Sequence, residues 1–247
     1  MSMQQMLMAM GGPFLFNAVI AANTNNYNLR SAAVSAGWNQ ITPLSATVTV
    51  NAGVLVGSTT VGGIAFSTDV TFPSGTTLNL INNGYIQGAG GAGAGGRGAG
   101  SNIGNGGINA VSGGTALSVL NAITITNNGT LAGGGGGGGG AGANNPAVTS
   151  GWTSGGGGGA GVVPGTGTAN GNSYVGGTGT QTTGGAGTGS SGDGGTGGAG
   201  GAWGAAGAVG TAGNATGPTP PGAAGYYCTG NAIVTWAATG TRLGLVS

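Results

Sequence analysis

The side chains that could carry out acid–base chemistry in this chain are two carboxylates, Asp69 and Asp193. General acid–base catalysis draws mostly on histidine or on a tuned carboxylate, and the chain has no histidine. A glycosidase would need these two carboxylates, which lie far apart in the sequence, to meet across one glycosidic bond. A zinc site would need clustered cysteine, histidine or carboxylate ligands. We therefore expect that the protein is not an enzyme and that it binds no metal or other cofactor.

Basic residues are equally sparse. Arg30, Arg97 and Arg242 make up the basic side chains, so that 2% of the chain is charged and the net charge is +1. Soluble domains typically carry about 25% charged residues. Nucleic-acid binding needs basic side chains that neutralise phosphates, and three scattered arginines form no such patch. The hydrated surface must then consist of Asn, Thr, Ser, Gln and peptide groups, which predicts a binding or structural protein.

Cys228 is the single cysteine of the sequence, so no internal disulfide is possible. We expect it to be a buried apolar side chain, with a bridge between subunits as the alternative. The apolar residues 1–22 lack the basic start of a signal peptide, and Gly11, Gly12 and Pro13 interrupt them. No stretch approaches the roughly 20 apolar residues of a membrane span. We expect neither a cleaved signal nor membrane insertion.

The chain divides into three segments of different composition, and each is expected to form different structural elements. Residues 1–87 have β-type composition and form the expected N-terminal attachment domain, residues 88–217 are dominated by glycine, and residues 218–247 return to aromatic and β-branched side chains. Residues 1–10 are rich in Met and Leu, which have high helix propensity. They predict a short helix that either docks into a neighbouring protein or packs against its own domain.

Strands are predicted from a period of two in residues 47–50, 78–81 and 123–126. One motif, a strand followed by Asn-x-Gly, an aliphatic residue and a second glycine, occurs at residues 50–57, 81–88 and 126–133. The Asn-x-Gly step supplies the positive-φ positions of a tight turn. A single rung of this kind cannot bury its apolar side. The rungs must therefore stack, either in a β-helix-like layer or in a small sandwich.

Glycine dominates the middle segment, and residues 133–140 are all glycine. Disorder is the usual expectation for such a sequence. Collagen would need a strict Gly-X-Y period, and calcium-binding β-rolls would need an Asp in each repeat; the sequence has neither. Polyglycine II helices are left-handed threefold helices without internal hydrogen bonds. Because glycine has no Cβ, such helices can pack in backbone contact and pair their N–H and C=O groups with one another.

Together these patterns predict a mainly β fold. An N-terminal β-rung or sandwich-like attachment domain is followed by a glycine-rich polyglycine II helix bundle with a closing C-terminal β segment. Residues 233–236 alternate like a strand and are expected to return to the attachment domain.

Polar and aromatic segments separate the glycine runs, and loops on a stiff scaffold are where binding residues gather. Tyr, Trp, Ser, Gly and Asn are also the residue types that antibody binding loops favour. The alternative is that the aromatic residues cover the outer face of the glycine bundle. The candidate binding residues in these loops are Asn144, Asn145, Trp152, Asn170, Asn172, Tyr174, Gln181 and Trp203.

Asn-Asn-Gly rungs that lead into glycine runs, at residues 82–93 and 127–142, resemble glycine-rich phage tail proteins, as does the segment 230–244. The overall plan is similar to the distal long-tail-fibre adhesins of T-even-like phages, over roughly residues 78–244. That resemblance implies a polyglycine II sandwich whose loops recognise outer-membrane proteins or surface glycans. It also implies other tail or fibre proteins as partners, an oligomeric assembly, and a place at the tail or tail-fibre tip of the virion, outside the cell.

Three other functions compete with the adhesin hypothesis. A purely structural minor tail protein would pack its glycine layers against other subunits. An ice-binding or cell-surface protein would show regular triplets, and the glycine phase drifts in the first run. A tailspike-like glycan hydrolase would have to use Asp69 and Asp193.

Overall fold

A computed structural model describes residues 12–96, 108–142, 155–167, 175–189, 195–213 and 217–247. The chain coils through five successive turns, and each turn contributes one strand to each of three sheets. The strands of the five turns are β1 (Phe14–Ile20), β2 (Thr24–Asn25) and β3 (Tyr27–Asn28); β4 (Leu44–Val50), β5 (Leu55–Gly57) and β6 (Ile64–Ser67); β7 (Thr77–Asn82), β8 (Tyr85–Gln87) and β9 (Thr115–Ser118); β10 (Ile123–Asn127), β11 (Thr130–Ala132) and β12 (Tyr226–Thr229); and β13 (Val234–Ala238), β14 (Thr241–Leu243) and β15 (Leu245–Val246). Helix α2 (Leu29–Ser35) follows the first turn, and the 3-10 helix η1 (Asn231–Ile233) precedes the fifth.

The three sheets are parallel throughout. Sheet A has the order β1-β4-β7-β10-β13, sheet B the order β14-β11-β8-β5-β2, and sheet C the order β15-β12-β9-β6-β3. This is the arrangement of a β-helix, which is the first of the two stackings that the repeat allowed. The mainly β prediction is confirmed. The predicted strands at residues 47–50, 78–81 and 123–126 lie within β4, β7 and β10.

The core lies inside the coil because strands β1, β4, β7 and β10 of sheet A alternate between buried and outward-facing residues. In β4 the apolar residues are buried and the Ser and Thr residues between them face outward. Val48, Leu80 and Ile125 are paired across β4, β7 and β10 and are fully buried. Stacked aliphatic columns of this kind stabilise parallel sheets by roughly 25 cal/mol per Å² of buried apolar surface.

Two of the three sequence repeats stack in the register that the sequence alignment gives. Asn82 pairs with Asn127, and Ile86 pairs with Leu131. The first repeat is displaced by one residue, because Val50 rather than Asn51 stands beside Asn82. The alignment of that copy was therefore wrong, and the register follows the buried column rather than the Asn-x-Gly motif.

The turn chemistry of the repeats also needs correction. Gly53 has a φ of 76°, as expected, but neither Gly84 nor Gly129 is among the residues with positive φ. Glycine is required at these two positions for another reason. A Cβ on Gly84 would lie 2.3 Å from the carbonyl oxygen of Val54, and one on Gly129 would lie 2.0 Å from that of Gly84. The corners of successive turns stack too closely for a side chain.

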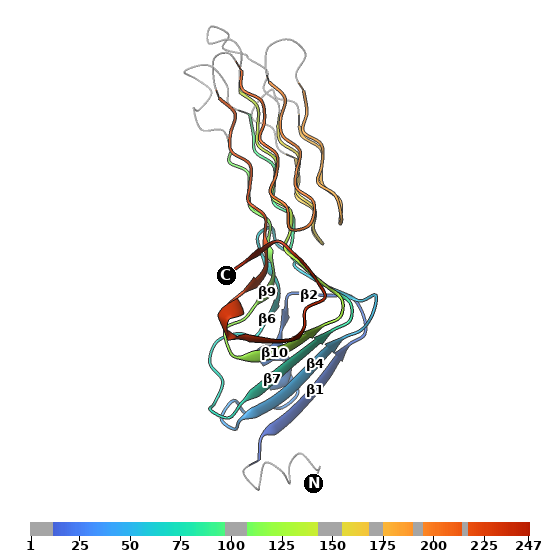
Figure 1. The fold of residues 1–247 in the computed structure, drawn as a ribbon, viewed down its shortest axis with the longest axis vertical. Coiled ribbons are helices and arrows are strands. Elements are labelled where there is room, and N and C mark those ends of the chain that lie inside the picture. Colours follow the sequence, from blue (N-terminus) through green and yellow to red (C-terminus); the bar gives the residue numbers. More distant parts are fainter. Residues whose placement is uncertain (1–11, 97–107, 143–154, 168–174, 190–194, 214–216) are drawn as a thin grey trace.

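Two insertions between sheets B and C form the glycine-rich region, one between β8 and β9 and the other between β11 and β12. Figure 1 shows their described parts as long segments that run side by side away from the β-helix. Strands β9, β10 and β11 lie between the two insertions in sequence, yet they extend the same three sheets as the strands of residues 1–87.

Backbone hydrogen bonds join the described glycine segments into three layers. The first layer contains residues 108–114, 88–96 and 164–167; the middle layer contains 217–225, 133–142, 155–160 and 175–180; the third contains 205–213, 195–202 and 184–189. Segments that are far apart in the sequence thus pair their backbone N–H and C=O groups with one another. These bonds satisfy the backbone polar groups of a region that belongs to no sheet.

The central segment, residues 133–142, shows a three-residue period in its hydrogen bonds. The N–H groups of residues 134–139 donate in rotation to segments 108–114, 155–160 and 205–213, over 2.7–3.0 Å. Their carbonyl groups accept in the same rotation from segments 217–225, 88–96 and 195–202. The segment is therefore enclosed by six others, and all its residues are buried.

The last turn closes the sheets from the C-terminal side. The strand expected at residues 233–236 is β13, which begins at Val234 and pairs with β10. Arg242 of β14 lies over the rings of Trp236 and Tyr227, 5.0 and 5.5 Å from their centres. The helix expected at residues 1–10 lies outside the described residues.

Candidate functional site

Of the segments that were expected to bind a receptor, 143–154 and 168–174 lie outside the described residues. In Figure 1, the described residues that flank 143–154 and 168–174 reach the end of the molecule opposite the β-helix. Six of the eight candidate residues lie outside the described residues, namely Asn144, Asn145, Trp152, Asn170, Asn172 and Tyr174. Their role stays a prediction.

The other two candidates, Gln181 and Trp203, lie together near the β-helix. The Trp203 indole N–H donates to the main-chain oxygen of Gln181. Gln87 of β8 donates its Nε2–H to the same oxygen over 2.9 Å, and the Tyr85 ring lies 6.3 Å from the Trp203 ring at an interplanar angle of 59°. These contacts join two turns of the glycine-rich region to strand β8, so here the structure favours the covering role considered for the aromatic residues.

Sequence reasoning missed Tyr85 and Gln87 as partners of this junction. Gln87 is 1% exposed although it is polar, and it stands in the rung position that Ala132 holds in the next turn. The sequence signal for this junction was a polar residue at a repeat position that is otherwise buried and apolar. A buried amide needs a hydrogen-bond partner, so Gln87 indicated a contact with another segment.

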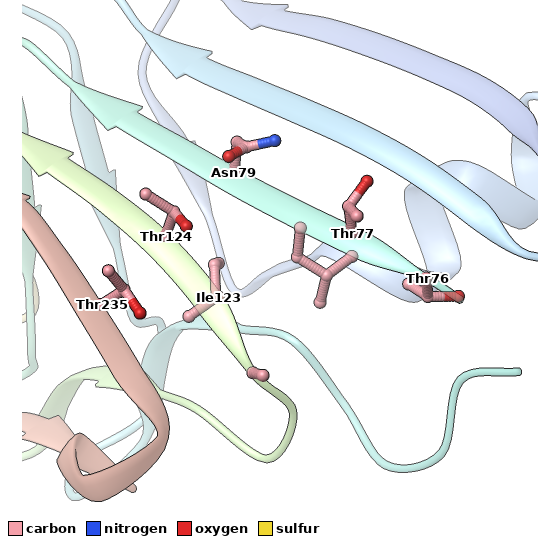
Figure 2. Close-up of a pocket in the computed structure, with 8 residues that line it drawn as sticks. Thr76, Thr77, Asn79, Ile123, Thr124 and Thr235 are labelled. Carbon is pink, nitrogen blue, oxygen red and sulfur yellow. The ribbon is translucent and has the colours of Figure 1, made fainter. Parts of the chain in front are cut away.

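An open groove lies on the outer face of sheet A, where β7 and β10 begin (Figure 2). β7 pairs with β4 from Thr77 onward but with β10 only from Asn79 onward, so the starts of β7 and β10 diverge. The groove has a volume of about 460 Å³ and is lined by Thr76, Thr77, Leu78, Asn79, Ala122, Ile123, Thr124 and Thr235. A hollow of about 200 Å³ continues it past Phe72 and Asn121. Sequence reasoning did not identify this groove.

The described charged side chains and the Cys228 thiol are absent from the lining of this groove. Asp69 accepts from the side chain of Asn28 over 3.3 Å and from its neighbour Val70 over 2.7 Å. Burial raises the pKa of the Cys228 thiol to about 11, although the nearby Arg242 lowers it. Cys228 is thus a buried neutral thiol at neutral pH, as expected from the sequence. The described part of the chain contains no group of three or more His, Cys, Asp or Glu residues placed to hold a metal.

Helices in the described ranges are all too short or too polar to cross a membrane. The molecule is a parallel β-helix that carries a layered, backbone-bonded glycine-rich region. This combination, with its near absence of charge, defines a glycine-rich β-helix class of protein. The chain belongs to the phage tail fibre adhesin Gp38 family, whose sequence model matches residues 15–247. The resemblance seen in the sequence is confirmed.

A solved structure with a similar fold is the gp37-gp38 adhesin tip complex of the bacteriophage S16 long tail fiber. It superposes with a TM-score of 0.60 at 20% sequence identity, over 96% of this chain and 83% of that chain. At this identity the likeness establishes the fold. No curated protein sequence matches the chain significantly.

Proposed function

We propose that the protein binds a receptor on the bacterial surface through the loops at the far end of its glycine-rich region, and that it does so without catalysis. The observation that carries this proposal is geometric. The glycine segments return repeatedly to the same end of the molecule, so segments that are distant in the sequence are held side by side there (Figure 1). Loops on such a support can act together on one partner.

The glycine segments are proposed to be polyglycine II helices. The rotation of hydrogen-bond direction with a period of three along residues 134–139 matches the three residues per turn of that helix. A bundle bonded in this way is rigid, and rigidity lowers the entropy that the attached loops lose on binding.

The receptor is proposed to be an outer-surface protein or glycan that the protein recognises by shape and hydrogen bonds. Two aspartates in the whole chain offer little for hydrolysis, and Asp69 is hydrogen-bonded on the β-helix. Several copies on one virion would raise the effective affinity of a modest contact.

The β-helix is proposed to join the protein to the tail fibre, which places the protein at the tail tip of the virion. The similar S16 structure is a complex of gp38 with gp37, which supports another tail fibre protein as the partner. We propose that the chain works as part of such an oligomeric assembly.

Binding of the purified protein to host cells tests this function. The double substitution Trp152→Ala plus Tyr174→Ala should abolish binding and the block of infection. Tyr226→Ala, an exposed aromatic residue on β12 of the β-helix, is the matched control and should bind normally. Circular dichroism must show that both variants fold. Full host binding by the folded double variant would refute the proposed site.

A further inference from the structure

We propose that the groove between β7 and β10 is a second binding site, for a neutral oligosaccharide. The site stands on the β-helix, on the face of sheet A, and is separate from the far end of the glycine-rich region (Figures 1 and 2). The groove is lined by residues of the β-helix alone and is independent of whether the loops bind the receptor.

The size and lining of the groove select an uncharged ligand. Its volume of about 460 Å³ falls in the range of about 300–1,000 Å³ that is usual for small-ligand sites. All the residues that line it are uncharged. A charged ligand would lose hydration there and gain no counter-charge, whereas a neutral one would not incur this cost.

Hydroxyl and amide groups form a row across the groove. Asn79, Thr124 and Thr235 are paired across three neighbouring strands, which places them about 4.8 Å apart from strand to strand. The hydroxyl groups of Thr124 and Thr235 have no hydrogen-bond partner in the described chain. Thr76, by contrast, already accepts from the N–H of Leu44 over 3.0 Å. Asn79 donates a side-chain N–H to the main-chain oxygen of Ala46 over 3.4 Å. The row can therefore offer the two threonine hydroxyl groups and the Asn79 side-chain oxygen to a ligand without breaking this bond.

Apolar surface lies next to this row. Leu78 and Ile123 line the groove where the two strands diverge, but each is only 3% exposed. The accessible apolar surface is therefore that of Ala122 in the groove and of Phe72 in the hollow that continues it. The Phe72 ring is held by stacking on Trp38, with ring centres 5.5 Å apart. A sugar chain has the matching character, since its rings carry hydroxyl groups at their rims and C–H groups on their faces.

An extended peptide fits the site less well. Peptides bind sheets mainly by adding a strand to a free edge, where main-chain hydrogen bonds hold them. β7 and β10 are both interior strands of sheet A, with β4 and β13 on their other sides. The face of the sheet presents side-chain hydroxyl and amide groups instead. These groups can form hydrogen bonds with the hydroxyl groups of a saccharide.

Titration of the full-length protein with maltohexaose, mannohexaose and chitohexaose tests the inference. Methyl groups of Ile and Thr are followed by NMR. At least one hexasaccharide should shift the methyl signals of Ile123, Thr124 and Thr235. The double substitution Thr124→Val plus Thr235→Val keeps the β-branched shape and removes two hydroxyl groups, and it should weaken binding about tenfold or more.

The matched control is Thr47→Val plus Thr126→Val, the same change at two half-buried outward positions of sheet A outside the groove. It should change the affinity less than about twofold, since it removes no ligand contact. Three results would overturn the inference. They are a lack of shifts with all three sugars, an equal loss in the control, and normal sugar binding by the groove variant.

The outcome is separable from that of the receptor loops. Trp152→Ala plus Tyr174→Ala should leave hexasaccharide binding intact. If that loop variant still binds host cells while the Thr124→Val plus Thr235→Val variant does not, the loop proposal fails and the groove proposal stands.

Discussion

Asn82 donates a side-chain N–H to the side-chain oxygen of Asn127 over 2.7 Å, and this bond joins the third and fourth turns of the β-helix inside its core. Asn127 in turn donates to the main-chain oxygen of Thr239 over 2.7 Å, which ties in the fifth turn. Both asparagines are at most 1% exposed. One column of amides thus fastens three turns at the corner where sheet A passes into sheet B.

Asn127→Ala should lower the free energy of unfolding by about 2–3 kcal/mol, because it leaves a buried N–H of Asn82 and the oxygen of Thr239 without this partner. Chemical denaturation measures the change. Asn128→Ala is the control, since Asn128 makes a 2.9 Å bond with Asn83 in the equivalent pair of turns but at the exposed surface. Asn128→Ala should lower the free energy of unfolding by no more than about 0.5 kcal/mol. Equal losses would mean that the buried column adds nothing beyond a surface bond.

Gly137→Ala should prevent the glycine-rich region from forming. A Cβ at this position would lie 1.8 Å from the carbonyl oxygen of Ala92, and the six surrounding segments leave no room for displacement. Gly189→Ala is the control, because the nearest atom to its Cβ would be Thr196 Oγ1 at 3.7 Å. Limited proteolysis should cut the Gly137 variant within residues 88–225 and leave the control intact. Resistance of the Gly137 variant would show that the central segment is less tightly enclosed than the hydrogen bonds indicate.

The strands of sheet A could be predicted from the sequence because their apolar and polar residues alternate over several positions. In sheet B, strands β5, β8 and β11 lie within the rungs predicted from the repeat. The other strands of sheets B and C could not be predicted, and β2 and β3, with two residues each, are too short to show a period. The register of the second and third repeats followed from Asn82 and Asn127. The register of the first repeat was predicted wrongly, because Val50 rather than an asparagine lies beside Asn82 in the column of stacked residues.

The groove on sheet A could not be predicted from the sequence for a topological reason. Thr124 and Thr235 are adjacent in space because the chain returns to sheet A after the long insertion between β11 and β12. No local sequence pattern indicates that the chain returns to sheet A at this point. Single outward threonines on strands also look like ordinary hydrated surface. The grouping of Trp203 with the loops had a similar cause, because the sequence does not show at which end of a glycine segment a turn lies.

Trp203→Ala should lower the thermal stability of the protein without reducing host binding by the folded fraction. The ring packs against Tyr85, and its N–H bonds the Gln181 oxygen, so its removal should cost about 1–2 kcal/mol. Differential scanning calorimetry and cell binding below the melting temperature measure the two effects. Lost binding with unchanged stability would instead make Trp203 a receptor contact.

Cys228 should make folding sensitive to alkaline pH. Its pKa is raised from 9.0 to about 11 by burial, so the folded state holds the thiol proton more tightly than the unfolded state. This contribution to stability is therefore complete below about pH 9 and is lost progressively as the pH rises to about 11. Tyr27 also has a pKa raised by burial and adds to the same trend. The comparison must therefore be made between the wild type and Cys228→Ala.

The wild type should lose more stability than Cys228→Ala between pH 8 and pH 11, as measured by urea denaturation at each pH. Cys228→Ala will itself lower stability at pH 8, since it leaves a small cavity in the core, so the slopes and not the absolute values decide. Arg242→Gln gives a second check. Arg242 lowers the thiol pKa, so its removal should raise the pKa of the folded state further. The loss of stability should still begin near pH 9 but continue to higher pH than in the wild type. Parallel pH profiles for the wild type and Cys228→Ala would show that the thiol is not buried as the structure has it.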